Sequence, residues 1–126
     1  MINSAKTIQI FLPDGNARSV RIAEITSRTV QAIQIPRTKI SEAGKREEVK
    51  NVGVYFLFGE DEETGLPLVY IGEAEECHIR IAQHNRTKGF WESAVAITSK
   101  TNSFTKAHVK YLEWYCHQQA VETNRY

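Results

Sequence analysis

The sequence predicts an α/β (α+β) fold, with helices packed on a small three-stranded antiparallel sheet and a β-rich N-terminal extension in front of it. From residue 52 onward, aromatic and β-branched runs alternate with runs of helical periodicity, in the order strand, strand, helix, strand, helix. Residues 1–50 carry mainly strand signals. At 126 residues the chain is long enough for one hydrophobic core, so residues 51–126 are expected to form the main domain.

The extension is predicted to begin with a β-hairpin. Residues 7–12 and 19–25 are apolar and β-branched, and the turn sequence Pro-Asp-Gly-Asn separates them. A third strand-like run, 29–35, stops at Pro36. The charged segment after it mixes helix formers with a glycine, which indicates a short, broken helix.

A second hairpin is expected from residues 52–58 and 68–71, which are joined by an acidic, glycine-containing loop. Residues 73–85 have the spacing of an amphipathic helix. Residues 93–99 read as the third strand of this sheet.

The last element is predicted to be a helix that Thr105 or Ser103 caps and that runs to about residue 121. Its core stripe is expected to be Val109, Leu112, Cys116 and Ala120. Trp91 and Trp114 are expected to serve as packing groups.

The charge distribution leaves nucleic acid open as a partner although the net charge is only +1. Residues 1–50 hold nine Lys or Arg against five Asp or Glu, and residues 51–126 hold seven against ten. Much of the later negative charge lies in the loop that starts at Gly59. No apolar run is long enough to span a bilayer, no secretory signal is readable, and the two cysteines have no metal-site spacing, so cytoplasmic residence and thiols that pack are expected.

Four sequence elements occur in order in residues 51–126. They are GVY at Gly53 to Tyr55, YIG at Tyr70 to Gly72, Arg80 ten residues after the second tyrosine, and Glu113 within the last predicted helix. With the longer strings around them, these elements resemble the GIY-YIG nuclease superfamily, and in particular a bacterial subgroup of it, over about residues 51–126. The resemblance implies metal-dependent endonuclease activity on DNA.

The resemblance also implies a role for each residue. Tyr55 would be the general base or would position the attacking water, with Tyr70 beside it. A phenol with a pKa near ~10 is a poor base at neutral pH unless a metal or cation lowers that value, and Arg80 would supply the positive field. Arg80 would also hold phosphate oxygens in a fork. The spacing of His84, one helical turn after Arg80, separately indicates a role in proton transfer or in contact with phosphate.

The remaining implied residues are a metal ligand and contacts to nucleic acid. Glu113 would bind one divalent cation, Mg²⁺ or Mn²⁺, because hard cations prefer carboxylate ligands. Gly72 and Asn124 would contact nucleic acid, and His117 lies one turn after Glu113. Because the chain stops soon after Asn124, a further C-terminal domain for target recognition is expected to be absent from it.

Structural alternatives remain open for each residue. The tyrosines are equally consistent with filling a sheet face, Arg80 with an ion pair to Glu76, and Glu113 with an ion pair to Lys110. Glu73 directly after YIG places negative charge where many relatives have a lysine or glutamine.

Three functions therefore follow as hypotheses. The first is a metal-dependent DNA endonuclease. The second is a nucleic-acid-binding or protein-interaction module that keeps the fold without cleavage. The third is a β-rich regulatory module in residues 1–50 for which the rest of the chain is mainly a scaffold.

Overall fold

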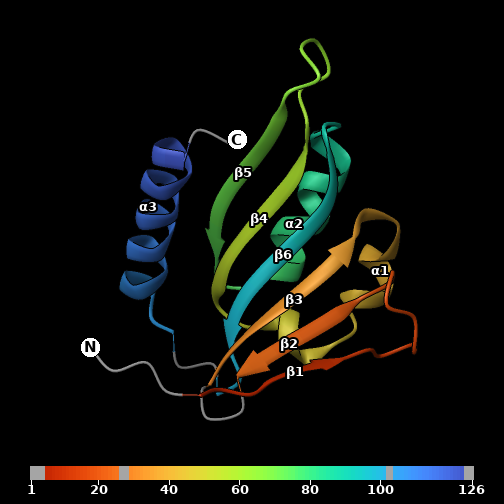
Figure 1. Ribbon diagram of the computed structural model, residues 1–126, viewed down its shortest axis with the longest axis vertical. Helices are drawn as coiled ribbons and strands as arrows, with labels where there is room; N and C mark the ends of the chain where they lie inside the picture. The colour runs from red at the N-terminus through yellow and green to blue at the C-terminus, as the bar shows by residue number, and fades with distance from the viewer. Residues whose placement is uncertain (1–4, 26–28, 102–103, 124–126) are drawn as a thin grey trace.

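A computed structural model describes residues 5–25, 29–101 and 104–123 (Figure 1). The chain forms a mixed α+β structure, which confirms the predicted class. In order, its elements are β1 (Ile8–Phe11), β2 (Arg21–Ile25), β3 (Val30–Pro36), the 3₁₀ helix η1 (Arg37–Lys39), α1 (Ile40–Ala43), the 3₁₀ helix η2 (Glu47–Lys50), β4 (Gly53–Glu60), β5 (Pro67–Ala74), α2 (Cys77–Thr87), β6 (Trp91–Ser99) and α3 (Lys106–Thr123).

All six strands belong to one antiparallel sheet of order β1-β2-β3-β6-β4-β5. The prediction of a three-stranded sheet was therefore too small. Strand β3 pairs with β6 from Val30 opposite Ser99 to Pro36 opposite Ser93, and so joins the first hairpin to the second. In a sheet of only β4, β5 and β6, strand β6 would have an open edge, and β3 covers that edge. Strands from residues 1–50 and strands from residues 51–126 therefore belong to the same sheet.

Helices cover the sheet on opposite faces (Figure 1). Neighbouring residues of a strand point to opposite faces, so Tyr55 and Val54 of β4 enter different cores. The larger core lies on the α2 face and unites both halves of the chain; it includes Val20, Ile22, Ile33, Ile35, Val49, Tyr55, Leu57, Cys77, Ile81 and Trp91. The smaller core, under α3, contains Val54, Ile71, Val109, Phe56, Val69, Leu112, Cys116 and Ala120.

Helix α3 starts with the predicted cap at Thr105. The His108 N–H donates to Thr105 Oγ1 at 3.2 Å, and the Thr105 N–H donates to His108 Nδ1 at 3.1 Å. This reciprocal pair resembles a capping box in which histidine takes the place of glutamate. The predicted core stripe is confirmed, and so is the packing role of Trp91, which is buried. Trp114 is 57% exposed, so its predicted packing role was wrong: it projects from the other side of the helix.

Arg37, which directly follows β3, fastens the C-terminal end of α2 to the N-terminal half of the chain. Its guanidinium donates to Oδ1 and the carbonyl oxygen of Asn85, both at 2.8 Å, and to the carbonyl oxygens of Gly89 and Trp91 at 3.2 and 2.9 Å. It also lies 4.6 Å from the centre of the Trp91 ring, in cation–π geometry. Residues 1–50 therefore help to position the helix that carries several candidate site residues.

Within the described parts of the chain, no helix has both the length and the apolar character needed to cross a membrane. Cys77 and Cys116 are both free thiols.

Candidate active site

The glycines of GVY and YIG are needed for close packing between neighbouring elements. Tyr55 lies opposite Gly72 in the register of β4 and β5, and its ring crosses over that glycine. A Cβ atom at Gly72 would lie 2.5 Å from the Tyr55 hydroxyl oxygen and 2.6 Å from Cζ. At Gly53 it would lie 2.2 Å from the carbonyl oxygen of Ile97 on β6. The two glycines are thus required by sterics, independently of any contact with a ligand.

Tyr55 and His84 form a buried hydrogen-bonded pair. The Tyr55 hydroxyl oxygen lies 2.7 Å from His84 Nε2, and the two residues are 1% and 5% exposed. Tyr70, which is half-buried, packs beside both, with its ring centre 6.2 Å from that of Tyr55 and 4.8 Å from that of His84. The structure therefore brings three of the predicted residues together on the α2 face of the sheet.

The Tyr55 phenol is a weaker acid than a free tyrosine. Burial is the largest cause and Tyr70 adds to it, and together they raise the pKa of Tyr55 to about 12. The charge of Arg80 and its hydrogen bonding with the phenol act in the other direction but do not outweigh burial. Arg80 therefore supplies the positive field that was expected of it, but the cation offsets only part of the desolvation.

His84 is kept neutral at physiological pH. Burial, followed by the positive charges of Arg80 and Lys88, lowers the pKa of His84 below its ordinary value. Because the pKa of Tyr55 is raised and the pKa of His84 is lowered, the pair rests as a neutral phenol and a neutral imidazole. Among the described residues, the buried Nδ1 atom of His84 has no hydrogen-bond partner.

Two cations lie at the edge of this cluster. Arg80 is exposed, and its Nη1 donates to Gln83 Oε1 at 2.6 Å; its side chain turns to this glutamine and not to Glu76, the alternative partner. Lys88 Nζ lies 4.7 Å from the centre of the Tyr70 ring. Sequence reasoning missed Lys88, which follows His84 by four residues and Arg80 by eight and caps the C-terminal end of α2.

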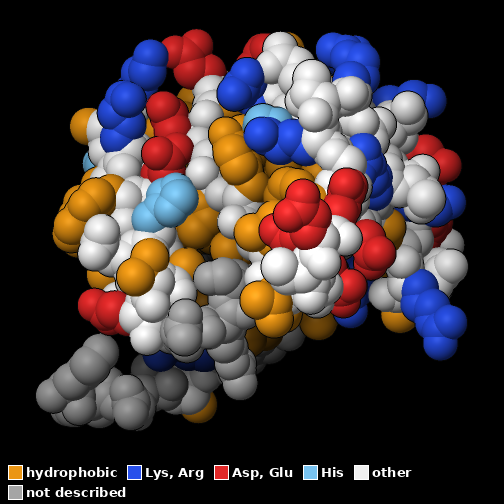
Figure 2. All heavy atoms as spheres, turned by 90° about the horizontal axis from the view of Figure 1, so that it is seen from above, with side chains coloured by type: hydrophobic (Ala, Val, Ile, Leu, Met, Phe, Trp, Pro, Cys, Tyr) orange, Lys and Arg blue, Asp and Glu red, His pale blue; other side chains and the backbone are white. Residues whose placement is uncertain are grey.

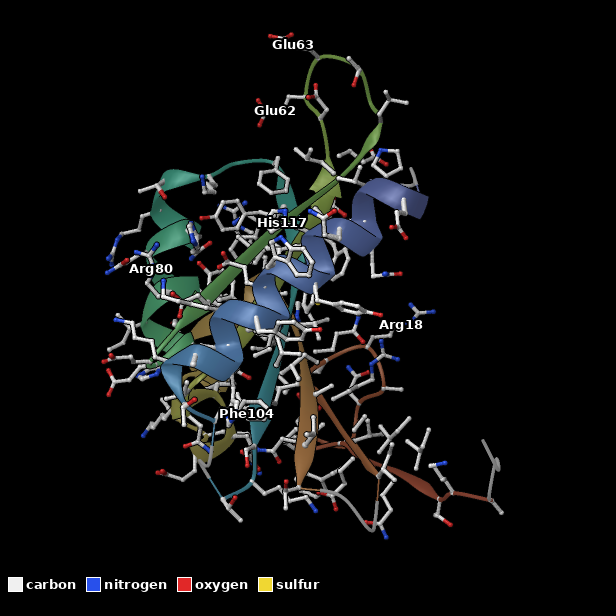
Figure 3. All side chains as sticks on the ribbon, turned by 90° about the vertical axis from the view of Figure 1, so that its left-hand side faces the viewer. Arg18, Glu62, Glu63, Arg80, Phe104 and His117 are labelled. Atoms are coloured by element: carbon white, nitrogen blue, oxygen red, sulfur yellow. The ribbon has the colours of Figure 1, made fainter. Side chains whose placement is uncertain are left out.

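Glu113 comes from the other side of the sheet. Helix α3 packs on the face opposite Tyr55, along the edge strand β5. In Figure 3 this helix lies in front of the sheet, while Arg80 projects from α2 behind it. Among the hydrogen bonds and ion pairs of the described residues, none joins Glu113 to the tyrosines. The predicted four-residue constellation is therefore only partly assembled by direct contact.

Lys110, the lysine that could have formed an ion pair with Glu113, is paired with another carboxylate. Lys110 Nζ lies 3.6 Å from Glu73 Oε1, and Lys106 Nζ lies 3.9 Å from Glu75 Oε1. Glu73 therefore points to the α3 face and is paired there, away from the tyrosine cluster. Glu113 is half-buried and follows Lys110 by three residues, next to β5.

A divalent cation fits this donor set only as a site with one protein carboxylate. The described residues contain no group of three or more His, Cys, Asp or Glu side chains that could hold a metal ion. Mg²⁺ nevertheless often binds through one or two carboxylates, completed by water and substrate phosphate. Glu113, whose neighbouring lysine is taken by Glu73, has the chemistry for that role. His117, on α3 one turn further on, is exposed, and Asn124 lies outside the described residues.

An acidic hairpin tip lies near one end of the cationic side of α2. It consists of Glu60, the last residue of β4, and Asp61, Glu62 and Glu63 in the loop that leads to β5. A Cβ atom at Gly89, next to Lys88, would lie 3.0 Å from Glu62 Oε1. Figure 2, seen from the hairpin end, shows acidic side chains near the middle of this face, with Lys and Arg side chains above and to the right of them.

The fold and the cluster define a class of protein: an α+β protein whose six-stranded antiparallel sheet carries a tyrosine–histidine pair beside exposed cations. Comparisons with protein-family models, with curated proteins and with solved structures gave no match to the chain.

Proposed function

We propose that this chain is a metal-dependent phosphodiesterase that cleaves DNA as an endonuclease. The observation that carries the proposal is the Tyr55–His84 hydrogen bond of 2.7 Å, with Arg80 beside it. A neutral imidazole that accepts a proton and a guanidinium that binds phosphate are two of the groups that hydrolysis of a phosphodiester requires.

In the proposed reaction His84 is the final proton acceptor. A water molecule held by the Tyr55 hydroxyl attacks phosphorus and transfers a proton to the phenol oxygen, while the phenol proton passes to His84 Nε2. The bond between phosphorus and the leaving oxygen breaks, and that oxygen takes a proton from solvent. Tyr55 ends the step as a neutral phenol, which agrees with its raised pKa.

Arg80 and Tyr70 bind the substrate in this scheme. The exposed guanidinium can donate two parallel hydrogen bonds to phosphate oxygens and stabilise the charge that develops on them. Tyr70 is half-buried, and its ring packs beside the rings of Tyr55 and His84. Glu113 would hold the divalent cation, and the cation would supply positive charge that stabilises the negative charge developing on a phosphate group.

The second candidate function is a module that binds nucleic acid without cleaving it. Two observations favour it, namely the raised pKa of Tyr55 and the position of Glu113 on α3, the helix that packs on the opposite face of the sheet from Tyr55. It needs the cations of α2 but no proton acceptor, so loss of His84 would leave it intact.

Cleavage of DNA in the presence and absence of metal separates the two functions. Supercoiled plasmid and branched DNA are incubated with the wild type, with Glu113→Ala and with Glu122→Ala, in Mg²⁺, Mn²⁺ or EDTA. Glu122 is the matched control because it is an exposed carboxylate on the same helix.

We expect the wild type and Glu122→Ala to cleave equally with metal and not in EDTA, and Glu113→Ala to lose about 10² or more in rate, the scale of removing one stabilising group from a transition state. Equal cleavage by all three proteins would contradict the role of Glu113. Binding without cleavage under every condition would favour the non-cleaving module.

A further inference from the structure

Lys88 has no role in the motif, yet it lies directly at the candidate site. Its ammonium group is 4.7 Å from the centre of the Tyr70 ring, and its charge contributes to lowering the pKa of His84. Tyr70 therefore has His84 against one part of its ring and Lys88 against another. A cation in this position lies where the proposed DNA substrate would contact Tyr70.

Arg80, His84 and Lys88 form a row that begins on α2 at Arg80 and ends at Lys88, the residue that caps the C-terminal end of the helix. The two residues are eight positions apart, about 12 Å along the helix axis at 1.5 Å per residue, with His84 midway. Arg80 affects the Tyr55 phenol, whereas Lys88 contacts the Tyr70 ring. The two cations therefore face different parts of the cluster, and one phosphate group cannot occupy both places.

We propose that Lys88 is a second phosphate-binding residue, which holds a phosphate of the DNA strand that flanks the scissile phosphate at Arg80. The inference rests on the proposed function. A strand of DNA carries a phosphate every ~3.4 Å of axis, so a row of about 12 Å reaches past the neighbouring phosphate. Lys88 thereby selects substrates that continue beyond the cleaved bond and fixes the position of the strand on the Tyr70 ring.

The acidic tip of the β4–β5 hairpin limits how far the DNA strand can extend along the protein surface past Lys88. Glu62 reaches the neighbourhood of Gly89, the residue directly after Lys88. In Figure 3, Glu62 and Glu63 are seen at the hairpin tip. Their negative charges repel phosphate, so the strand has favourable contacts up to Lys88 and unfavourable ones beyond it.

The test pairs Lys88→Gln with single neutral phosphates in the substrate. A short fluorescein-labelled DNA is cleaved in single-turnover experiments with Mg²⁺, and the cleaved bond is mapped. In a series of otherwise identical substrates, one flanking phosphate at a time is replaced by an uncharged methylphosphonate. Arg86→Gln is the matched control, because it removes one charge from an exposed position of the same helix outside the row.

We expect a methylphosphonate at one position to lower the kcat/KM of the wild type about tenfold. Lys88→Gln should lower the kcat/KM for the unmodified substrate by a similar factor. At that position the two changes together should cost little more than either alone, because they remove the same contact. Arg86→Gln should lose the same factor as the wild type at that position. Additive losses at every position, or equal behaviour of Lys88→Gln and Arg86→Gln, would overturn the assignment.

Binding distinguishes failure of this inference from failure of the proposed function. If the wild type binds the DNA but does not cleave it, the proposed hydrolysis fails, and the same series is measured by fluorescence anisotropy. Lys88→Gln should then weaken binding and lower the slope of log K against log salt by about 0.7 to 0.9, the contribution of one phosphate contact. An unchanged slope in Lys88→Gln would overturn the inference.

Discussion

Arg80→Ala is expected to lower the kcat/KM for DNA cleavage by about 10² to 10³. Arg80 is an exposed cation whose charge acts on both Tyr55 and His84, and its guanidinium can donate a bidentate hydrogen bond to phosphate, which the ammonium group of Lys88 cannot. Loss of one such donor at a developing negative charge typically has this effect on rate. The loss should fall mainly on kcat, since the contact strengthens as charge accumulates on the phosphate oxygens.

Arg86→Ala serves as the control for charge alone. It lies six residues after Arg80 on α2 and is exposed, but it points away from the row that contains His84. It should change kcat/KM by less than about threefold at moderate salt, because an exposed charge outside the site is screened. A similar loss in both variants would show that overall charge, and not the site, supports activity.

Gly72→Ala is expected to lower the free energy of unfolding by about 2–4 kcal/mol. The added methyl group would lie 2.5 Å from the Tyr55 hydroxyl oxygen, and Tyr55 is among the largest fully buried side chains. Overpacking of a core typically costs about 1–3 kcal/mol, and displacement of the ring also breaks the hydrogen bond to His84, worth about 1 kcal/mol. Urea unfolding followed by circular dichroism measures the change.

Two further variants test whether the Tyr55 ring is the cause. Gly44→Ala is the control, since its Cβ would meet the Ile40 carbonyl oxygen at 3.4 Å, and its effect should stay within about 1 kcal/mol. In a Tyr55→Leu background the ring is absent, and Gly72→Ala should cost at least about 1 kcal/mol less than it does in the wild type. A Gly72→Ala protein as stable as the wild type would contradict the packing described for YIG.

Most of the local structure could be predicted from the sequence because it depends on neighbouring residues. The turn at Pro13 to Asn16, the hairpin that carries both tyrosines and the capping of α3 by Thr105 all arise within a few residues. The pairing of β3 with β6 could not be predicted in the same way. It joins residues that are between 57 (Pro36 and Ser93) and 69 (Val30 and Ser99) positions apart, and the alternating pattern of β3 indicates a buried face but not a partner.

The sequence predicted the positions of the site residues on α2 and the sheet better than it predicted their pKa values. The spacing of Tyr55, Tyr70 and His84 is enough to place them near one another once β4, β5 and α2 are assigned. The sign of the pKa change of Tyr55 depends on how deeply the ring is buried, which no spacing reveals. Helix α3 likewise has two apolar stripes, and the sequence does not show which of them packs on the sheet. One stripe is buried, whereas Tyr111, Trp114 and Tyr115 form a second apolar stripe that is exposed.

The pH dependence of single-turnover DNA cleavage in Mg²⁺ tests most directly whether the Tyr55–His84 pair works as a neutral phenol with a neutral imidazole acceptor. Because the pKa of His84 is lowered, the acceptor is neutral at neutral pH, and activity falls only as the pH drops through a value below about 6.5. Because the pKa of Tyr55 is about 12, no further ionisation of the pair enters before strongly alkaline pH.

The account therefore predicts a rate that rises with pH, reaches a plateau by about pH 7 and stays level to pH 9, with the acid limb lost and the plateau lowered in His84→Gln. A rate that climbs about tenfold per pH unit from 7 to 9 in both the wild type and His84→Gln would contradict it, since that profile requires a base other than His84.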